Sequence, residues 1–480
     1  MAENTPASSE KKVKGPPEPE PIKPYCPVTV EPIVFLVLTS VIMTSSLRQQ
    51  YIYYRIGNGT VNQQGSSCFG NNSNSSAYQE RQGDQAEAIQ WATAIQLSSG
   101  IPALVMTIMI GSLSDKLGRK LNLIMPILGT LINFTVAAFV VQFNLPLVVL
   151  LPGIFMLGLG GNIASLNGGC YAYIADITVK GRSRYFRQAL LPAAVGAAGI
   201  VGSLGGSSWF QRLGFPLGVS QPFWFAVGVS GFCLLYTIFA IKETCPRKAG
   251  SQLCALSNIT GIIQLFKVKR KTPRWPLGVL CLMLSLLWGI YNALPGIFVT
   301  YLVGPPFCWS PGFVGYFQVA IGAGFFVSAV AIRLFNKYPY GLIMVGYISG
   351  IGCLTLVGLS SYTPNKDATL FIAAAIGCVQ SSSNTLVRTT MSKMVGPEEQ
   401  GSLFGLVSFV TNLSGVVFVP LWNFVYSSTL SIIPGMVFFI FVGVIVICAI
   451  LTGFVKFKAP EMAEETLVTE EKEDYDLSKL

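Results

Sequence analysis

The stretch 111-GSLSDKLGRK-120 decides the fold of this chain, because it places four charged residues between two long apolar segments. The flanking segments, 95–110 and 121–143, are rich in Ile, Leu, Val and Phe. A helix that crosses a bilayer needs about 20 mainly apolar residues, so each flank suits a membrane helix. We interpret the charged stretch as the short loop of a helical hairpin at the membrane surface.

The composition of the whole chain agrees with a polytopic membrane protein. Its 480 residues are 51% hydrophobic and 11% charged, and the mean hydropathy is +0.57. A soluble globular chain carries about 25% charged residues. The net charge of +10 would suggest a nucleic-acid partner in a soluble protein, but here Lys and Arg fall in short segments between apolar runs. We therefore expect a lipid bilayer as the surroundings and no nucleic acid.

The titratable side chains argue against an enzyme. The sequence has no His, and its 11 Cys form no CxxC pair and no zinc-like spacing. It also has no phosphate-binding loop with its Lys-Ser/Thr pair. Because no nucleophile stands beside a base either, we expect no catalytic residue, no metal and no cofactor.

Twelve apolar segments are long enough to cross a bilayer, which predicts an all-α polytopic membrane protein. They lie near 31–52, 90–112, 120–142, 146–174, 187–211, 221–242, 276–303, 312–334, 340–361, 367–391, 402–425 and 432–456. Lys and Arg concentrate in the cytosolic loops of membrane proteins. If both termini are cytosolic, this rule holds for every Lys and Arg of the chain except Arg48, Arg55, Arg81, Arg212 and Lys366.

The charged segment near the middle of the chain separates two sets of six helices. Two six-helix bundles joined by a cytosolic linker are typical of alternating-access transporters, whose substrate site lies between the bundles near the midplane. The expected divisions are a disordered cytosolic N-tail (1–30), a first bundle (31–242) with an outer loop (53–89), a linker (243–275), a second bundle (276–456) and an acidic cytosolic C-tail (457–480).

The polar outer loop predicts how the chain lies in its membrane. It holds three Asn-x-Ser/Thr sequons, at Asn58, Asn71 and Asn74, which accept glycans only on the exoplasmic side. Cys68 and Cys308 are the two clearest cysteines on that oxidising side, and we expect them either to form a disulfide between the halves or to remain two free thiols. These features favour the plasma membrane or an endolysosomal membrane.

The opening stretch resembles the loop signature of the major facilitator superfamily. The matching positions are Gly111, Leu113, Asp115, Gly118, Arg119 and Lys120. Glycines allow a sharp turn and close helix packing, and an Asp can accept a charge-assisted bond from the Arg four residues later. The resemblance implies a gating role. The alternative is ordinary positive charge on the cytosolic side.

Further strings are similar to solute carrier family 46, the group that contains the proton-coupled folate transporter. They are VEPIVFL (30–36), QQYIYYRI (49–56), AYIAD (172–176), PFCW (306–309), VRTTMSK (387–393) and EQGSLF (399–404). The resemblance implies the major facilitator fold, a disulfide between the bundles and import of organic solutes. It also implies gating or coupling roles for the residues that match the motifs, Asp115, Arg119, Asp176 and Arg388.

The chain departs from the folate-carrying members at three positions. The string LLPAAVG (190–196) stands where they have an acidic residue, Tyr291 stands at their histidine, and Gly153 stands at a basic residue. Carboxylates and imidazoles are the usual proton carriers. We therefore do not expect a folate transporter of that kind, and co-transported protons remain an open possibility.

Polar residues within the spans are the candidates for substrate contact, because a polar group facing lipid is costly. Arg48 and Arg388 favour an anionic substrate; the alternatives are an interfacial residue for Arg48 and a cytosolic latch for Arg388. Helix–helix hydrogen bonding is the alternative for the uncharged candidates. These are Asn162, Asn167, Tyr291, Asn292, Tyr316, Gln380 and Asn384, while Asp176 and Arg182 are expected in a gate.

The sequence therefore predicts transport of small organic solutes, with an anion as the expected substrate. The competing hypothesis is a receptor or adaptor that uses the same scaffold without transport. Binding of labelled anions without accumulation in vesicles would indicate the receptor and not the transporter.

Overall fold

The computed structural model describes residues 29–57, 76–177, 182–244, 275–335, 338–394 and 400–458. Within these ranges the regular secondary structure is helical, as expected. The two tails, the sequons at Asn58, Asn71 and Asn74, and Cys68 lie outside the described residues. So do the side chains of 110–117, of Asp176 and of Arg182, although their backbone is helical.

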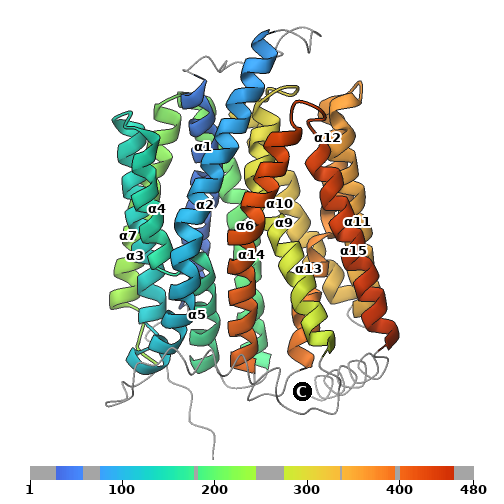
Figure 1. The fold of residues 1–480 in the computed structure, drawn as a ribbon. Coiled ribbons are helices and arrows are strands. Elements are labelled where there is room, and N and C mark those ends of the chain that lie inside the picture. The colour runs from blue at the N-terminus through green and yellow to red at the C-terminus, as the bar shows by residue number, and fades with distance from the viewer. Residues whose placement is uncertain are drawn as a thin grey trace, which may run out of the picture.

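The first half of the chain forms a bundle of long helices (Figure 1). In chain order these are α1 (Glu31–Ile56), α2 (Ser76–Leu117), α3 (Leu121–Gln142), η1 (Leu147–Val149), α4 (Leu150–Leu159), α5 (Asn162–Ile177), α6 (Arg182–Leu213) and α7 (Leu217–Phe239).

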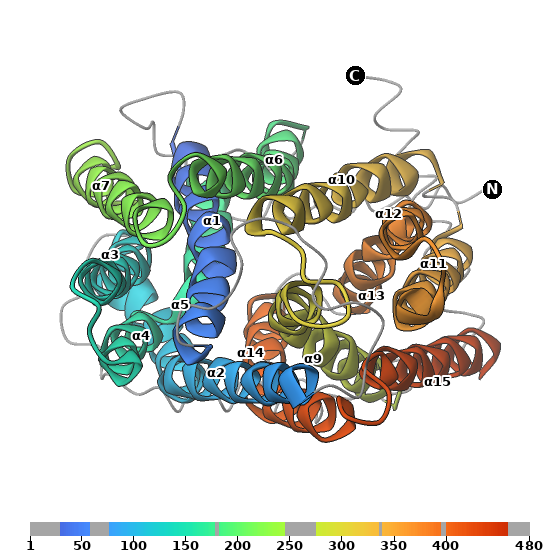
Figure 2. The same cartoon turned by 90° about the horizontal axis from the view of Figure 1, so that it is seen from above.

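The second half repeats this plan beside the first (Figure 2). Its elements are α9 (Trp275–Val303), α10 (Pro311–Leu334), α11 (Pro339–Leu359), η2 (Ser360–Tyr362), α12 (Lys366–Ile376), η3 (Gly377–Val379), α13 (Ser381–Lys393), α14 (Gln400–Thr429) and α15 (Met436–Lys458).

The chain is a multi-pass membrane protein. Ten of the described helical segments are long and apolar enough to span a membrane. Two further long helices, α2 and α6, lie alongside these ten segments (Figure 1). Together they are compatible with the expected twelve crossings. Large apolar side chains stay exposed on the outer surface, such as Phe239 on α7 and Ile348 on α11. Exposed apolar surface of this extent suits contact with lipid.

The upper turns of α2 differ from the expected outer loop of 53–89. The helix α1 continues to Ile56, and α2 begins at Ser76, well before the apolar segment that starts near 90. These turns are rich in Ala, Gln and Glu, which have high helix propensity but low hydropathy. A search for apolar segments therefore misses them, although they prolong the same helix above the rest of the molecule (Figure 1).

The fourth span of each half is broken near its middle. In the first half the helix stops between α4 and α5, where Gly161 and Asn162 have φ of 86° and 61°. Such left-handed angles end a helix and favour Gly or Asn. In the second half the 3-10 turn η3 separates α12 from α13. The expected single spans 146–174 and 367–391 are thus discontinuous helices.

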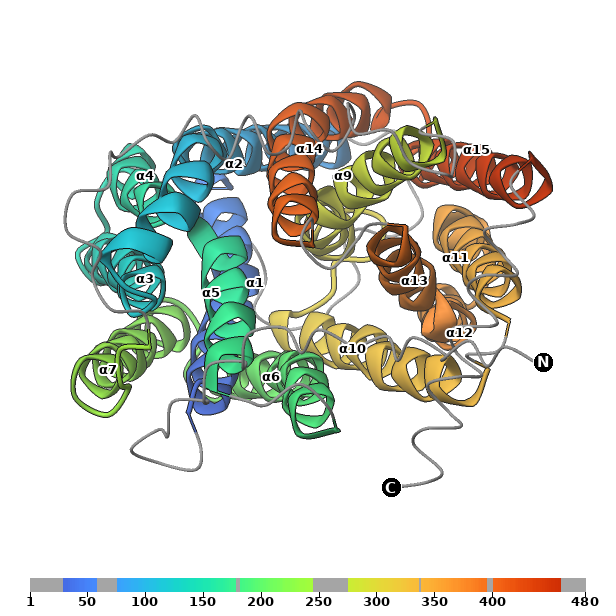
Figure 3. The ribbon, with the colours of Figure 1, turned by 90° about the horizontal axis from the view of Figure 1, so that it is seen from below.

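The two halves pack against each other along several helices. We call the end that carries the first turns of α2 and the last turns of α9 the upper end (Figure 1). Extensive contacts join α2 to α14 and α6 to α10, and α1 contacts α9. Among the described residues, α5 and α13 share no extensive contact, and they face across the centre when the molecule is seen from below (Figure 3).

The loop of the opening stretch is held by an acidic residue from the end of the first half. The Glu243 carboxylate accepts hydrogen bonds from the backbone N–H of Arg119 (2.7 Å) and of Lys120 (3.3 Å). These groups lie at the start of α3, where a helix favours negative charge. Gly118 has φ of +120°, and a Cβ there would lie 2.3 Å from the Glu243 carboxylate. The turn therefore requires glycine at this position.

We expect Gly118→Ala to lower the free energy of unfolding by about 1–3 kcal/mol, because it adds backbone strain and displaces the Glu243 carboxylate. Thermal unfolding of the detergent-solubilised protein measures the change. Gly83→Ala is the matched control, since it lies in a helix with no atom within 4 Å of an added Cβ. It should raise stability by up to about 1 kcal/mol. Equal stability of the two variants would contradict this account.

Candidate functional site

The breaks in the two fourth spans place polar side chains at the centre of the molecule. Below the first break, α5 carries Ser165, Asn167 and Tyr171. Below the second, α13 opens with the run 381-SSSNTLVR-388. Discontinuous helices at equivalent positions of two halves are a strong pointer to a binding site. Both runs lie on the helices that face each other across the centre (Figure 3).

Arg388 is the main charged group of this region. Its guanidinium carbon lies 4.5 Å from the centre of the Trp288 ring on α9. Its Nε is buried and makes no hydrogen bond within the described part of the chain. Arg388 also interacts electrostatically with Tyr171 of α5, in the opposite half. A guanidinium carries five N–H donors, so this one retains donors for an anionic ligand.

The aromatic and amide side chains of α9 surround Trp288. The rings of Trp288 and Tyr291 are 6.3 Å apart, and the Tyr291 hydroxyl donates to the backbone oxygen of Gln380 at 3.5 Å. Asn292 donates through Nδ2 to the Trp288 backbone oxygen at 2.9 Å. These contacts hold the indole that lies against Arg388. Cation–π contacts of Arg with Trp contribute about 0.5–2 kcal/mol.

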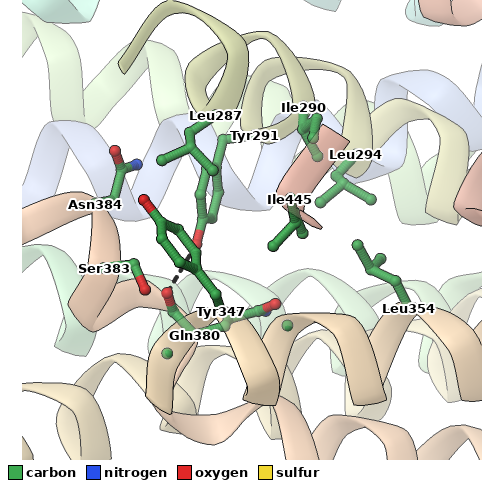
Figure 4. Close-up of a pocket in the computed structure, with 12 residues that line it drawn as sticks. Leu287, Ile290, Tyr291, Leu294, Tyr347, Leu354, Gln380, Ser383, Asn384 and Ile445 are labelled. Atoms are coloured by element: carbon green, nitrogen blue, oxygen red, sulfur yellow. Dashed lines mark hydrogen bonds between the residues drawn. The ribbon is translucent and has the colours of Figure 1, made fainter. Parts of the chain in front are cut away.

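A small cavity lies next to the second break, inside the second half (Figure 4). Its volume of about 20 Å³ is enough for a water molecule and too small for an organic solute. Tyr291, Gln380 and Asn384 contribute its polar lining. The Asn384 Oδ1 is buried and has no hydrogen-bond partner among the described residues. This orphaned acceptor marks the cavity as a polar site in an otherwise apolar core.

Gln96 is a site residue that our sequence analysis missed. Its Nε2 and the Nδ2 of Asn292 lie 2.8 and 3.5 Å from the point where a Cβ on Gly415 would stand. Carboxamides from α2 and α9 therefore meet at a glycine of α14, at the interface of the halves. The signal was present, since Gln96 is a polar residue within an apolar span, but its partners are remote in sequence.

The second predicted cation, Arg48 on α1, is half-buried and makes no hydrogen bond or ion pair within the described part of the chain. The neighbouring Gln49 reaches across the interface to Thr300 of α9 at 3.1 Å. Arg48 therefore lies on a helix that contacts both halves. Its neighbour Gln49 contacts the last turn of α9, so Arg48 lies nearer the upper end than Arg388 does.

The other predicted residues lie in different environments. The Oδ1 of Asn162 accepts a hydrogen bond from the backbone N–H of Ile163 at 2.8 Å, at the start of α5. Asn167 is half-buried on α5, and Tyr316 of α10 is 46% exposed. Cys308 is disulfide-bonded, while its expected partner Cys68 lies outside the described residues.

The gate residues of the opening stretch are only partly described. The side chain of Lys120 donates to the backbone oxygen of Ile238 at the end of α7. Gly111 lies within α2, but the side chain of Asp115 is not described, so its expected bond with Arg119 stays a prediction. Arg119 instead contributes its backbone N–H to Glu243.

Comparison with known proteins gives relatives of nearly full length. The family model of the Major Facilitator Superfamily matches residues 61–420. The proton-coupled folate transporter of Rattus norvegicus is 28% identical over 88% of this chain and 91% of its own length. The lysosomal proton-coupled steroid conjugate and bile acid symporter SLC46A3 of Mus musculus is 29% identical over 92% of this chain and 97% of its own.

Solved structures have the same fold at low sequence identity. The human organic anion transporter MFSD10 (TETRAN) superimposes with a TM-score of 0.60 at 15% identity, over 88% of this chain and 98% of that one. The peptide transporter POT in complex with sulfate gives 0.61 at 12% identity, over 91% and 94% of the two chains.

We expect Asn384→Leu to raise the free energy of unfolding by about 1 kcal/mol, because it removes a buried acceptor that has no partner. Ser383→Ala, one residue away, should lower it by a similar amount, since the Ser383 hydroxyl donates to the Ile343 backbone oxygen at 2.9 Å. Chemical or thermal unfolding in detergent compares the two variants. Equal destabilisation by both would mean that Asn384 has a structural partner.

Proposed function

Because this chain belongs to the major facilitator superfamily, we propose that it carries small organic anions across a membrane by alternating access. Transport of small organic solutes is the function that its relatives and its fold support, and these relatives are transporters and not enzymes. The anionic character of the substrate is the finer part of the proposal. It rests on the side chains at the centre of the molecule.

The observation that carries the proposal is the position of Arg388. Its guanidinium lies against Trp288, has a buried Nε without a partner in the described chain, and interacts with Tyr171 of the other half. A buried cation is costly unless it is paired. An anion that binds between the halves supplies the missing charge. Arg48 provides a second positive group for the same substrate.

The uncharged residues complete the substrate site. Tyr291, Gln380 and Asn384 line the water-sized cavity beside the second break, and Asn292 and Gln96 approach Gly415 where the halves meet. Asn162 and Asn167 of α5 and Tyr316 of α10 are further candidates. Aromatic and amide groups of this kind suit a substrate with an apolar body and a hydrogen-bonding group.

In this proposal the described state is the one that opens towards its lower end. Side-chain amides join the halves at the upper end, whereas α5 and α13 share no extensive contact below. The opening stretch with Gly111, Asp115, Gly118, Arg119 and Lys120, together with Asp176 and Arg182, forms the gate at this lower end. In the opposite state this gate closes and the upper end opens, so that the site is exposed to one side at a time.

Protons are the coupling ion of this proposal, since the relatives in solute carrier family 46 are named as proton-coupled. The chain has no His, and Tyr291 cannot replace an imidazole as a carrier near neutral pH. A carboxyl group must then bind the proton. Asp115 and Asp176 are the acidic residues of the gate and are the candidates for this role.

The orientation follows from the charges and the sequons. Both termini and the linker 243–275 are cytosolic, and the upper end is exoplasmic with glycans at Asn58, Asn71 and Asn74. The Cys68–Cys308 disulfide then forms in the oxidising compartment. The membrane is the plasma membrane or an endolysosomal membrane, and one relative is named as lysosomal.

We expect Arg388→Gln to reduce uptake of an anionic substrate about 10- to 100-fold, because a hydrogen bond to a charged group contributes about 1.5–3 kcal/mol. Uptake of labelled organic anions into cells or proteoliposomes, at pH 5.5 and pH 7.4, measures the change. Higher uptake at pH 5.5 is expected from proton coupling. Arg48→Gln tests the second cation in the same assay.

Arg333→Gln is the matched control, because Arg333 is an exposed arginine in the last turn of α10. It should transport at the wild-type rate. Binding of the anion without accumulation would contradict transport. Full activity of Arg388→Gln would contradict the proposed anion site.

We expect digestion with an N-glycosidase to lower the apparent mass of the protein expressed in mammalian cells. Replacement of Asn58, Asn71 and Asn74 by Gln should abolish this change, because these sequons are the exoplasmic ones. A fourth sequon at Asn258 lies in the cytosolic linker and serves as the internal control. If Asn258→Gln alone abolished the mass change, the linker would be exoplasmic and the proposed orientation would be wrong.

A further inference from the structure

Side-chain amides join the two halves at the upper end. We propose that Gln49, Gln82, Gln85, Gln318 and Asn423 act as a carboxamide lock, which holds this end closed and must release before the site opens upward. Each donates a hydrogen bond from one half of the chain to the other. This proposal depends on alternating access but not on the identity of the substrate.

The centre of the carboxamide lock is Thr300, in the last turn of α9. Its backbone oxygen accepts from Gln85 of α2 at 3.0 Å, and its hydroxyl accepts from Gln49 of α1 at 3.1 Å. Gln85 also reaches the Pro305 backbone oxygen at 3.5 Å. Because Gln85 is completely buried and Gln49 nearly so, both amides are shielded from water. Two helices of the first half therefore hold one turn of the second.

Three further hydrogen bonds flank this centre. On one side, Asn423 of α14 donates to the Thr93 hydroxyl of α2 at 2.9 Å, and Gln82 donates to the Leu430 backbone oxygen at 3.1 Å. On the other side, Gln318 of α10 donates to the Ser46 hydroxyl of α1 at 3.2 Å. The carboxamide lock thus spans the whole width of the interface.

The chemistry of these bonds suits a gate that must close and open repeatedly. All of them join uncharged groups, so closure does not remove a charge from water. When the gate opens, water replaces each lost partner, and the net free energy of one neutral hydrogen bond is therefore small. Several weak bonds acting together can hold the closed state and still be released in one step.

The backbone at the end of α9 is adapted to this contact. A Cβ on Gly304 would lie 1.6 Å from the Nε2 of Gln85, so that no other residue fits while Gln85 is in place. Gly304→Ala therefore displaces the Gln85 side chain from the Thr300 backbone oxygen, and the Gln85 amide itself stays in the protein. It provides a second way to disturb the carboxamide lock.

Among the described residues, one side-chain hydrogen bond joins the halves near the lower end: Asn412 of α14 donates to the Thr107 hydroxyl of α2 at 3.2 Å. The side chains of 110–117, Asp176 and Arg182 at this end are not described. Within the part of the chain that the structure describes, the amide bonds between the halves therefore gather at the upper end.

Spin labels on the two halves test the proposal. We would place p-acetylphenylalanine at Gly83 and Tyr362, which are exposed at the upper ends of the two halves, so that the native cysteines stay unchanged. Double electron–electron resonance on the purified, reconstituted protein then measures their separation. Gln85→Ala and Gly304→Ala should each add a longer distance. The ratio of open to closed molecules should rise about three- to tenfold.

Gln90→Ala is the matched control, because Gln90 is an exposed glutamine on the same helix and makes no bond in the described structure. Its distance distribution should equal that of the wild type. The proposal is overturned if Gln85→Ala and Gly304→Ala leave the distribution unchanged in folded protein. It is also overturned if Gln90→Ala shifts the distribution equally, because the amide bonds would then not be the cause.

Discussion

A polar group inside a bilayer has no water to replace a missing partner, and this constraint organises the whole structure. Every helix satisfies its backbone internally, which is why the described chain is built from helices that run across the membrane. Polar side chains in the spans also need hydrogen-bond partners within the protein, and they have no regular helix pattern that supplies them. Two buried atoms without a partner among the described residues, the Asn384 Oδ1 and the Arg388 Nε, lie on α13 directly after the second break.

Charged and uncharged polar groups have different surroundings in the molecule. The guanidinium of Arg388 on α13 lies against the Trp288 ring of α9. The upper end is held by amides and hydroxyls, whose bonds need no counter-ion. In the proposed function, the charge of Arg388 gives affinity for anionic solutes. Neutral bonds at the gate can be exchanged with water at little cost, so that the same protein can bind and then release.

The tyrosine at position 291 can be explained by its contacts in the structure. The family resemblance predicts a histidine of the folate-carrying members at the position of Tyr291, whose hydroxyl donates to the Gln380 backbone oxygen beside η3. Its ring also lies next to Trp288, the residue that supports the guanidinium. A tyrosine at this position keeps the aromatic wall of the site and removes a titrating group. Proton binding, if it drives transport here, has to occur on carboxyl groups elsewhere.

The sequence by itself determined the fold, because apolar length and the position of charged loops depend on residues that are close along the chain. It also placed Arg388 and Asn384 among the polar residues of the spans. Three contacts were decided only by the tertiary structure. The Gln96 and Asn292 side chains both approach Gly415. Glu243 accepts a hydrogen bond from the turn at Gly118, and Gln85 donates to the end of α9. Each joins residues far apart in sequence, and a hydrogen bond depends on which faces of two helices meet. Hydropathy along one chain carries no information about that choice.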